Sequence, residues 1–533
     1  MRKSAVTVAA ALLSLLPGAA ALAEGPVLPA FVEDTADSGV DMRFMGDWQY
    51  MVGGGVATFD CNADGFDDLY LAGGEASAGF FVNRSARGGP LRFSPGESGL
   101  ELSGVLGAYP LDIDSDGMVD LMILRQGENV VMRGRGDCRF ERANEAWGID
   151  GGDAWWTAFA ATWERGNAWP TLAVGAYVDR EQEISPWGSC TDNWLLRPEG
   201  ERYGAPTPLV PSYCALSMLF TDWNLSGTPA LRIANDREYY EGGQEQLWKL
   251  PAGAPPSLYT AAEGWKVLRI WGMGIASADL TGDGYPDYFI TSMADSKLQT
   301  LAEPPAGGAA RPTYADIAYR RGVTAHRPSF GDDLRPSTAW HTQFEDVNND
   351  GRLDLFIAKG NVDRMEDFAN ADPNNLMLQQ ADGGFVDVAQ QAGMASPETS
   401  RGAAMPDFNL DGLVDLVVVN RRSPAQIWRN ATADAGNWVE LRLSQPAPNP
   451  GAVGARVELR AGDLPVSREV TVGGGHVSGQ YGLMHFGMGA ADMAEVRVVW
   501  PDGTAGDWLS VPANGFVVID RDAGVQPWSP ARD

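Results

Sequence analysis

The sequence is poor in positive charge and in long apolar segments. Lys and Arg number 40 against 70 Asp and Glu, so the formal net charge is −30. Neutralising nucleic-acid phosphates requires clustered cations, and we therefore expect no nucleic-acid partner. After the first 23 residues, no apolar stretch approaches the roughly 18 residues that a transmembrane helix requires. We accordingly expect no membrane span.

Cysteines and the common catalytic signatures are also scarce. The sequence contains no nucleophile elbow, HExxH motif, P-loop or dinucleotide fingerprint. Its four cysteines, Cys61, Cys138, Cys190 and Cys214, lack the spacing of a zinc site. Four cysteines allow three disulfide pairings. Of these we favour Cys190 with Cys214, which leaves Cys61 with Cys138.

The N-terminus indicates export. Arg2 and Lys3 precede an apolar run over residues 5–16, and the segment 21–23 (Ala-Leu-Ala) has the small residues of a cleavage site. We interpret residues 1–23 as a cleavable signal peptide. The protein is then expected to be periplasmic or secreted, where disulfides persist.

Glycine, proline and a repeated acidic frame are abundant. Gly (64) and Pro (34) are typical of many short strands joined by turns, and 44% hydrophobic residues are enough for a folded core. Five segments share the frame D-x-[DNT]-x-D-G-x-x-D, at residues 60–68, 112–120, 279–287, 346–354 and 407–415.

The frame predicts a calcium site. Side chains at positions 1, 3 and 5 converge when the loop curls, Gly at position 6 permits the turn, position 7 offers its carbonyl and position 9 another carboxylate. This oxygen cage suits Ca²⁺ better than Mg²⁺, and we expect about five Ca²⁺ ions. An EF-hand is excluded, because position 12 is Leu, Ile or Val rather than Glu. The expected ligands are Asp60, Asn62, Asp64, Phe66 and Asp68; Asp112, Asp114, Asp116, Met118 and Asp120; Asp279, Thr281, Asp283, Tyr285 and Asp287; Asp346, Asn348, Asp350, Arg352 and Asp354; and Asp407, Asn409, Asp411, Leu413 and Asp415.

Two further frames, at residues 163–171 and 222–230, keep the spacing but lose most ligands. We assign no calcium to the first and expect the loop at Asp222 to be weak or empty. Short apolar strands surround each frame, so seven frames predict a seven-bladed β-propeller with four strands per blade. Residues 31–39 are similar to residues 385–393. We therefore expect the N-terminal segment to complete the blade that contains residues 407–430.

These repeats resemble the FG-GAP/VCBS repeats of integrin-α-type propellers. Downstream, the segments Gly451–Gly454, Gly473–Gln480, His485–Gly489 and Trp500–Gly503 resemble the ASPIC/UnbV domain that follows such propellers in the cartilage acidic protein family, which has bacterial members. The resemblance implies a secreted calcium-binding protein and names no substrate. We expect an all-β chain: a propeller over 24–432, a small antiparallel β-sandwich or barrel over 437–521, whose residues alternate apolar and polar, and a tail over 522–533.

Two functions remain open at this stage. The first is a non-enzymatic binding, scaffold or adhesion-type module whose partner is an unknown extracellular protein or glycan. The alternative is a propeller-based enzyme, acting on polysaccharide or as a quinoprotein-like oxidoreductase, that uses the central channel or acidic pairs such as Asp332-Asp333 and Glu366-Asp367. Trp155 and Trp156, in a Trp-rich stretch, are either blade core or a platform for sugar rings. His476, Ser478 and His485 are more consistent with structural roles than with a catalytic set.

Overall fold

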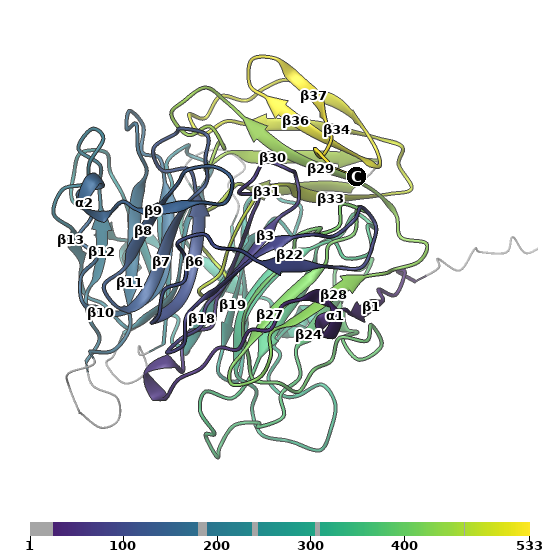
Figure 1. Ribbon diagram of the computed structural model, residues 1–533, viewed down its shortest axis with the longest axis horizontal. Coiled ribbons are helices and arrows are strands. Elements are labelled where there is room, and N and C mark those ends of the chain that lie inside the picture. Colours follow the sequence, from purple (N-terminus) through teal and green to yellow (C-terminus); the bar gives the residue numbers. More distant parts are fainter. Residues whose placement is uncertain (1–24, 180–188, 237–242, 304–309, 463, 533) are drawn as a thin grey trace, which may run out of the picture.

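The structure is a computed structural model that describes residues 25–179, 189–236, 243–303, 310–462 and 464–532 (Figure 1). The expected signal peptide over 1–23 lies outside these ranges. Within them, strands dominate and each helix is a single turn, as expected from the many turn residues. The helical turns are α1 (Thr35–Ser38), η1 (Trp48–Tyr50), α2 (Asn144–Trp147), η2 (Ala261–Glu263) and α4 (Ala318–Arg321). No helix in the described ranges is long and apolar enough to cross a membrane.

Antiparallel pairing groups most of the described strands into seven units of four. Two residue pairs, Ala154 with Gly127 and Trp155 with Gln126, join the second and third units into one sheet. The first three are β2 (Val56–Phe59), β3 (Asp68–Leu71), β4 (Gly79–Asn83) and β5 (Phe93–Pro95); β6 (Val105–Leu111), β7 (Asp120–Gly127), β8 (Val130–Gly134) and β9 (Phe140–Arg142); and β10 (Ala154–Thr162), β11 (Thr171–Ala176), β12 (Asn193–Leu196) and β13 (Thr207–Leu209). The next three are β14 (Ala215–Thr221), β15 (Ala230–Asn235), β16 (Gln246–Lys249) and β17 (Ser257–Leu258); β18 (Gly272–Ala278), β19 (Asp287–Ser292), β20 (Lys297–Leu301) and β21 (Tyr314–Asp316); and β22 (Ala339–Glu345), β23 (Asp354–Lys359), β24 (Asn375–Gln379) and β25 (Phe385–Asp387).

The seventh unit joins the two ends of the propeller sequence. It contains β26 (Ser400–Ala404), β27 (Leu416–Asn420), β28 (Gln426–Asn430) and the N-terminal strand β1 (Phe31–Glu33). Phe31 pairs with Asn430 in antiparallel register, so the predicted closure by the N-terminal segment is confirmed. The first strands of consecutive units contact one another around the molecule, and β26 contacts β2. These contacts confirm the propeller-type fold and support a closed ring of seven units.

The C-terminal domain consists of two further four-stranded sheets that lie across one end of the propeller (Figure 1). One contains β33 (Met484–Gly489), β29 (Asn437–Ser444), β36 (Gly515–Asp520) and β37 (Gly524–Trp528), and the other β31 (Leu464–Glu469), β30 (Arg456–Ala461), β34 (Met493–Val499) and β35 (Leu509–Pro512). Strands β29 and β36 pair in parallel, so this sheet is not purely antiparallel as we expected. β37 extends the sheet past residue 521 into the expected tail.

The segment between β31 and β33 fills the centre of the propeller. We call residues 470–482 the plug loop. Its strand β32 (Gly479–Tyr481) pairs in parallel with β2, and the loop forms single bridges to the first strands of three other units, at Ala108, Ala161 and Ile275. The N–H of Gly474 also donates to the carbonyl of Met218 at 2.6 Å, so the loop contacts β14 of the fourth unit as well. The loop is therefore bonded to most of the ring from inside.

Glycines on the inner strands create the room for the plug loop. A Cβ built on Gly55 would lie 1.8 Å from the carbonyl oxygen of Val477, and one on Gly107 would lie 2.0 Å from the same atom. A Cβ on Gly402 would lie 2.4 Å from the hydroxyl of Ser478. Backbone can approach backbone this closely only where no side chain intervenes. The propeller and the C-terminal domain are thus fitted to each other along the channel.

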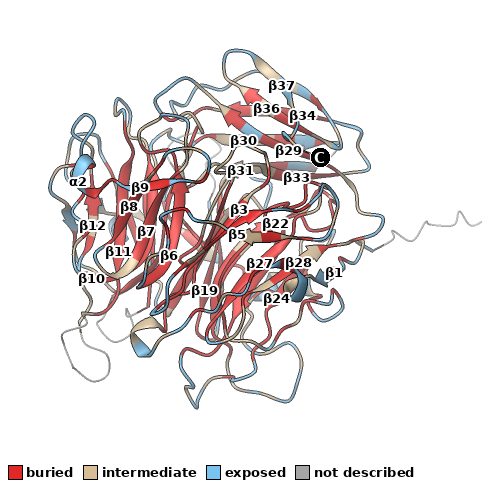
Figure 2. Ribbon diagram, viewed as in Figure 1, coloured by how far each residue is buried: buried red, intermediate tan, exposed pale blue. Residues whose placement is uncertain are grey.

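Burial follows the same architecture. Figure 2 shows the propeller strands in red almost throughout and the exposed residues on turns and outer edges. One cluster of buried apolar residues combines Phe344 and Ile357 of the propeller with Val439, Val457 and Phe486 of the C-terminal domain. The two modules therefore share a continuous core, and their separation would expose apolar surface to water.

Both favoured disulfides are present. Cys61 pairs with Cys138 and Cys190 with Cys214. Cys61 occupies position 2 of the first frame, so its disulfide ties that loop to the turn between β8 and β9. These bonds and the repeat architecture are consistent with an extracellular or periplasmic location.

Candidate metal centres

Six of the seven frames fold into the same loop. The carboxylate at position 1 accepts the N–H of the Gly at position 6 at 2.6–3.0 Å. The residues at position 1 are Asp60, Asp112, Asp222, Asp279, Asp346 and Asp407. One bond per loop is enough to bend the chain around a central point. The frame is thus a structural unit as well as a ligand pattern.

Two left-handed residues shape each of these loops. The glycines at position 6 have φ between 73° and 95°. Position 4 is also left-handed although it is glycine only at Gly282; Ala63, Ser115 and Asn349, for example, have φ of 57° to 59°. A non-glycine residue in this conformation costs free energy. The sequence frame did not reveal this strain, because position 4 carries no characteristic residue.

The carboxylate at position 9 connects the loop to the rest of its unit. In the five complete frames, one oxygen accepts the N–H of position 2 at 2.8–3.2 Å. In four of them the other oxygen accepts the N–H of the last residue of the unit's third strand, at 2.8 Å. These four carboxylates belong to Asp68, Asp120, Asp354 and Asp415. Position 9 is therefore expected to hold the loop in shape and to face the cation at the same time.

In the second frame the expected ligands converge in a way that suits Ca²⁺. One oxygen each of Asp112, Asp114 and Asp116 lies within 4.8 Å of the others. At position 5, one oxygen accepts the N–H of position 7 at 2.9–3.0 Å in all five complete frames, which orients the carboxylate. Several oriented carboxylates with a nearby carbonyl form the hard-oxygen environment that Ca²⁺ prefers. The residues present therefore fit the ion.

Burial raises the pKa of many of these carboxyls. It raises the pKa of Asp112 and Asp287 to about 6, that of Asp68 to about 7, and those of Asp120 and Asp346 to about 8. Neighbouring carboxylates add to the effect. A group of like charges in a desolvated loop favours protonation unless a cation compensates it.

We predict that calcium affinity falls steeply as the pH is lowered from 8 to 6. The ion requires ionised carboxylates, and their raised pKa values, at about 6 to about 8, place the competition with protons in this window. With ordinary Asp pKa values the loss would begin below about pH 5. Isothermal titration calorimetry at pH 6, 7 and 8 measures the effect. Equal affinities at the three values would contradict the prediction.

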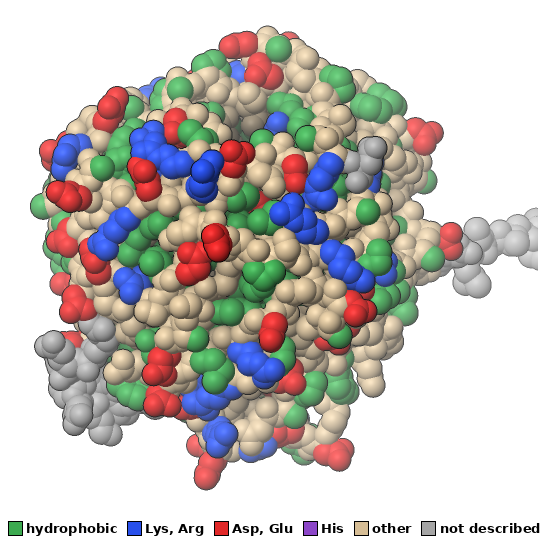
Figure 3. Space-filling model, viewed as in Figure 1, with side chains coloured by type: hydrophobic (Ala, Val, Ile, Leu, Met, Phe, Trp, Pro, Cys, Tyr) green, Lys and Arg blue, Asp and Glu red, His purple; other side chains and the backbone are tan. Residues whose placement is uncertain are grey.

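The negative charge of the chain is partly hidden in these loops. Asp68, Asp120 and Asp415 are 0% exposed. In Figure 3, acidic and basic side chains are interspersed on the face in view and form no single acidic patch. Part of the −30 charge therefore lies in the frames rather than on the outer surface.

All seven frames contact the C-terminal domain. We call the propeller end that carries them the loop face. The contacts include a hydrogen bond from the Asp279 N–H to the Ser467 carbonyl at 3.4 Å and one from the Gly436 N–H to the Asn348 carbonyl at 3.0 Å. Trp438 packs so closely on Gly412 that a Cβ there would lie 1.9 Å from the indole. The conformation of the loops and the position of this domain therefore depend on each other.

The residues of the C-terminal domain that reach the frames were not predicted. The His485 ring lies between Glu440 (Nδ1 to Oε1, 3.1 Å) and Asn349 of the sixth frame (Nε2 to Oδ1, 2.7 Å). Burial lowers the pKa of His485 to about 4 and raises that of Glu440 to about 8. Sequence spacing gave no signal for these contacts, because more than 100 residues separate His485 from its propeller partner.

The two degenerate frames use the C-terminal domain in place of ligands. Position 9 of the fourth frame is Ala230, and Glu469 accepts hydrogen bonds there from the Asp222 N–H at 2.8 Å and the Thr221 hydroxyl at 2.6 Å. In the third frame, Arg165 donates to the carbonyl of Asp502 at 2.9 Å. Protein contacts thus hold these loops where the other frames have additional carboxylates.

The structure corrects the proposed sugar platform. Trp155 and Trp156 are both 0% exposed, and Trp156 packs against Trp194 with ring centroids 4.7 Å apart. Neither ring can contact a ligand from solvent. The core interpretation of this Trp-rich stretch is the correct one.

Of the residues considered for catalysis, Asp333 and His476 are engaged in structural contacts, whereas Glu366 and Asp367 are exposed. Asp333 forms an ion pair with Arg335 at 2.6 Å, and hydrogen bonds from Arg335 hold its pKa well below the usual range. His476 is 0% exposed inside the plug loop, and burial lowers its pKa to about 3. The plug loop also occupies the centre of the ring, where the enzymatic alternative placed its substrate. A cavity of about 600 Å³ remains around the plug loop. Glu469, which borders this cavity and whose pKa burial raises, is used by Thr221 and Asp222.

Comparisons with known proteins agree with this architecture. Residues 445–526 match the family model "ASPIC and UnbV", and residues 346–418 match an FG-GAP-like repeat. Cartilage acidic protein 1 of Mus musculus is 30% identical over 169 residues, which cover 30% of this chain and 23% of the relative. The Xenopus tropicalis protein of the same name is 24% identical over 237 residues, covering 44% and 34%. The chain thus spans about a quarter to a third of the length of these relatives.

Solved structures match only distantly. A crystal structure of BBS1N in complex with ARL6DN overlaps with a TM-score of 0.40 at 11% identity, over 75% of this chain and 97% of the other. An N-acetylglucosamine-recognising lectin from Agrocybe aegerita overlaps with a TM-score of 0.38 at 16% identity, over 68% and 88%. These overlaps add nothing to the family comparison.

Proposed function

From the premise that residues 445–526 match the ASPIC and UnbV family model and residues 346–418 an FG-GAP-like repeat, we propose that the chain is an extracytoplasmic calcium-binding module without catalytic activity. Calcium in the five complete frames would hold the loop face in one shape, and the C-terminal domain rests on that face. The propeller would then be rigid, with the plug loop in its channel, and would present its outer surfaces to a partner.

The observation that carries the proposal is the repeated loop geometry. Each complete frame has a position 1 carboxylate bonded to Gly at position 6, a position 5 carboxylate bonded to position 7, and a position 9 carboxylate bonded to position 2. Five such loops, built from residues far apart in sequence, converge on one end of the propeller. A purely mechanical turn does not need three carboxylates in nine residues, with those at positions 1 and 9 at least partly buried, because their mutual repulsion is unfavourable without a cation.

The partner is expected away from the loop face. The C-terminal domain covers that face and the plug loop fills the channel, so an extracellular protein or glycan would bind the sides of the propeller, its opposite end or the outer sheet of the C-terminal domain. Specificity in such proteins resides in exposed connections rather than in the repeat. Glycan arrays and pull-down from extracellular fractions, each with calcium and with a chelator, would identify the class of partner.

We predict that the calcium-free protein takes up about five Ca²⁺ ions with the ligand set described. Isothermal titration calorimetry and metal analysis after gel filtration give the number. Asp116→Asn should remove one site from the count. Asp222→Asn, in the fourth frame where Glu469 binds the loop, is the matched control and should leave the count unchanged. A protein that retains no Ca²⁺ after gel filtration would contradict the proposed function.

A further inference from the structure

We propose that residues 528–532, which we call the strap, clamp the first frame, and that the strap and a calcium ion in this frame stabilise each other. The inference rests on the proposed function, because it assigns a regulation to one of the proposed sites. It concerns the last residues that the structure describes; Arg532 lies 468 positions from Asp64 in the loop that it contacts.

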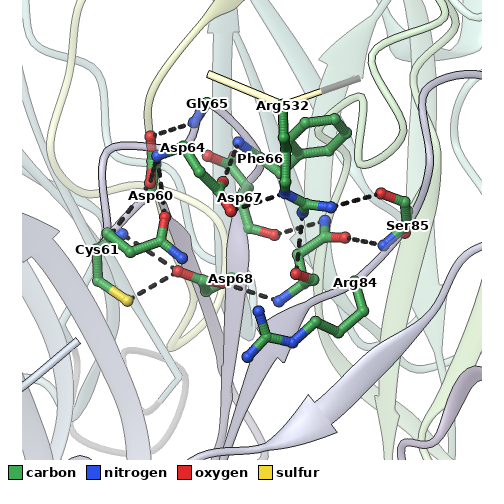
Figure 4. Close-up of polar contacts among 12 residues, drawn as sticks. Asp60, Cys61, Asp64, Gly65, Phe66, Asp67, Asp68, Arg84, Ser85 and Arg532 are labelled. Atoms are coloured by element: carbon green, nitrogen blue, oxygen red, sulfur yellow. Dashed lines mark hydrogen bonds and ion pairs between the residues drawn. The ribbon is translucent and has the colours of Figure 1, made fainter. Parts of the chain in front are cut away.

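The strap binds the first frame through the backbone of Ala531 and through the side chain of Arg532, which Figure 4 shows beside Asp64 and Phe66. The N–H of Ala531 donates to the carbonyl of Asp64 at 3.0 Å. Nε of Arg532 donates to Oδ2 of Asp64 at 2.8 Å, and the guanidinium carbon lies 3.9 Å from the centre of the Phe66 ring. Both residues are expected calcium ligands, Asp64 at position 5 and Phe66 at position 7.

The contact leaves no space over the turn of the loop. Gly65 lies between the two ligands with φ of 95°. A Cβ on Gly65 would lie 2.7 Å from the indole of Trp528 and 3.0 Å from Cβ of Pro530. The strap therefore lies directly on the residue that allows the frame to bend, and movement of one requires movement of the other.

Arg532 also contacts the end of β4, which is bonded to the position 9 carboxylate of the same frame. Its two terminal nitrogens donate to the carbonyls of Ser85 at 2.8 Å and Asn83 at 2.9 Å. The N–H of Asn83 in turn donates to Oδ1 of Asp68, the position 9 carboxylate, at 2.8 Å. The Arg532 side chain thus contacts position 5 directly and is linked to position 9 through Asn83. It does so from outside the loop.

This arrangement is expected to prepare the loop for the ion. Oδ1 of Asp64 accepts the N–H of Phe66 at 3.0 Å and Oδ2 accepts from Arg532, so the carboxylate has one orientation. Groups that orient a ligand in this way typically contribute about 10- to 100-fold to metal affinity. Because coupling between two binding events is reciprocal, calcium in the loop must strengthen the attachment of the strap by the same factor.

Other frames provide internal controls. The position 5 carboxylates Asp116 and Asp350 also meet arginines, Arg133 at 2.8 Å and Arg352 at 3.1 Å. Both arginines belong to the same unit as the loop that they contact. Among the described residues, the strap contacts a position 5 carboxylate in the first frame, through Arg532 and Asp64. Disturbing the second or sixth frame should therefore leave the strap in place.

Hydrogen exchange of the peptide covering residues 524–532 tests the coupling in the full-length protein. In the wild type with calcium we expect strong protection, and about 10-fold or greater faster exchange after chelation. Asp64→Asn should give the fast exchange even with calcium, whereas Asp116→Asn should exchange like the wild type. In the reverse direction, Arg532→Gln and a chain ending at Ser529 should each weaken one of the calcium sites by about 10- to 100-fold in calorimetry, and Arg352→Gln should not affect exchange of the strap.

The outcomes separate this inference from the proposed function. If calorimetry shows calcium binding but exchange at residues 524–532 is the same with and without it, the coupling is wrong and the calcium proposal stands. If no calcium binds to the wild type, both fail. The chain ending at Ser529 keeps all of β37, so a normal circular dichroism spectrum with unchanged calcium affinity would also overturn the inference.

Discussion

Removal of calcium should lower the melting temperature by on the order of 10 °C or more. A site held at a free calcium concentration of 100 times its dissociation constant contributes about 2.7 kcal/mol, and several such sites act together. The loss is large because the loops cannot relax freely. Burial, and to a smaller extent neighbouring carboxylates, raise the pKa values of Asp354 and Asp407 well above the usual range.

Differential scanning calorimetry with calcium, with EGTA and after re-addition of calcium measures this effect at pH 7.5. The effect should shrink at pH 5.5, because protons then neutralise the carboxyls whose pKa values lie at about 7 and about 8 in Asp68 and Asp120. The sign follows from the raised pKa values: in the calcium-free protein these groups favour the folded state as the pH falls. Coincident melting curves with calcium and EGTA at pH 7.5 would refute the prediction.

A single methyl group on the inner wall of the propeller should destabilise the protein by about 3 kcal/mol. In Gly107→Ala the new Cβ would meet the carbonyl oxygen of Val477 at 2.0 Å and the Cβ of Val477 at 2.6 Å. Both the wall and the plug loop are buried backbone, so neither can move aside at low cost. We expect the plug loop to be displaced from the channel before the blades themselves unfold.

Urea unfolding gives the change in stability, and hydrogen exchange of residues 470–482 shows whether the plug loop has lost protection. Gly55→Ala should behave in the same way, because its Cβ would lie 1.8 Å from Val477 O. Gly515→Ala is the matched control, since no atom lies within 4 Å of a Cβ built there. If Gly107→Ala melted within a degree of this control, the plug loop would not be a fitted part of the fold.

The features that sequence reasoning predicted are local or periodic. The frame at 60–68 and its repeats carry their turn residues at fixed spacing, and apolar segments of strand length flank them, so the all-β propeller could be expected. The similarity of residues 31–39 to 385–393 was sufficient to predict that the N-terminal segment completes the last blade, where Phe31 pairs with Asn430. The pairing of Cys190 with Cys214 could also be predicted, because the two cysteines lie close to each other along the chain.

The features that were missed depend on contacts between modules. The Gly-rich segment 473–475 marked the family but gave no indication that it enters the channel, because its partners, such as Met218 and Ile275, lie in separate blades. Trp155 and Trp156 were candidates for a surface platform, and the composition of the segment does not reveal which side of a strand is covered. Glu469 has no motif at all, yet it holds the loop at Asp222.

Local chemistry can be predicted from a sequence, because a carboxylate at position 1 of the frame and a glycine at position 6 interact whatever surrounds them. In this protein it specified the fold class, the repeat and the candidate ligands such as Asp60 and Asp68. The tertiary structure alone decided that the C-terminal domain rests on the loop face, that residues 470–482 fill the channel, and that Arg532 clamps Asp64. These contacts join residues hundreds of positions apart, and their existence depends on the shapes of two complete domains rather than on any spacing along the chain.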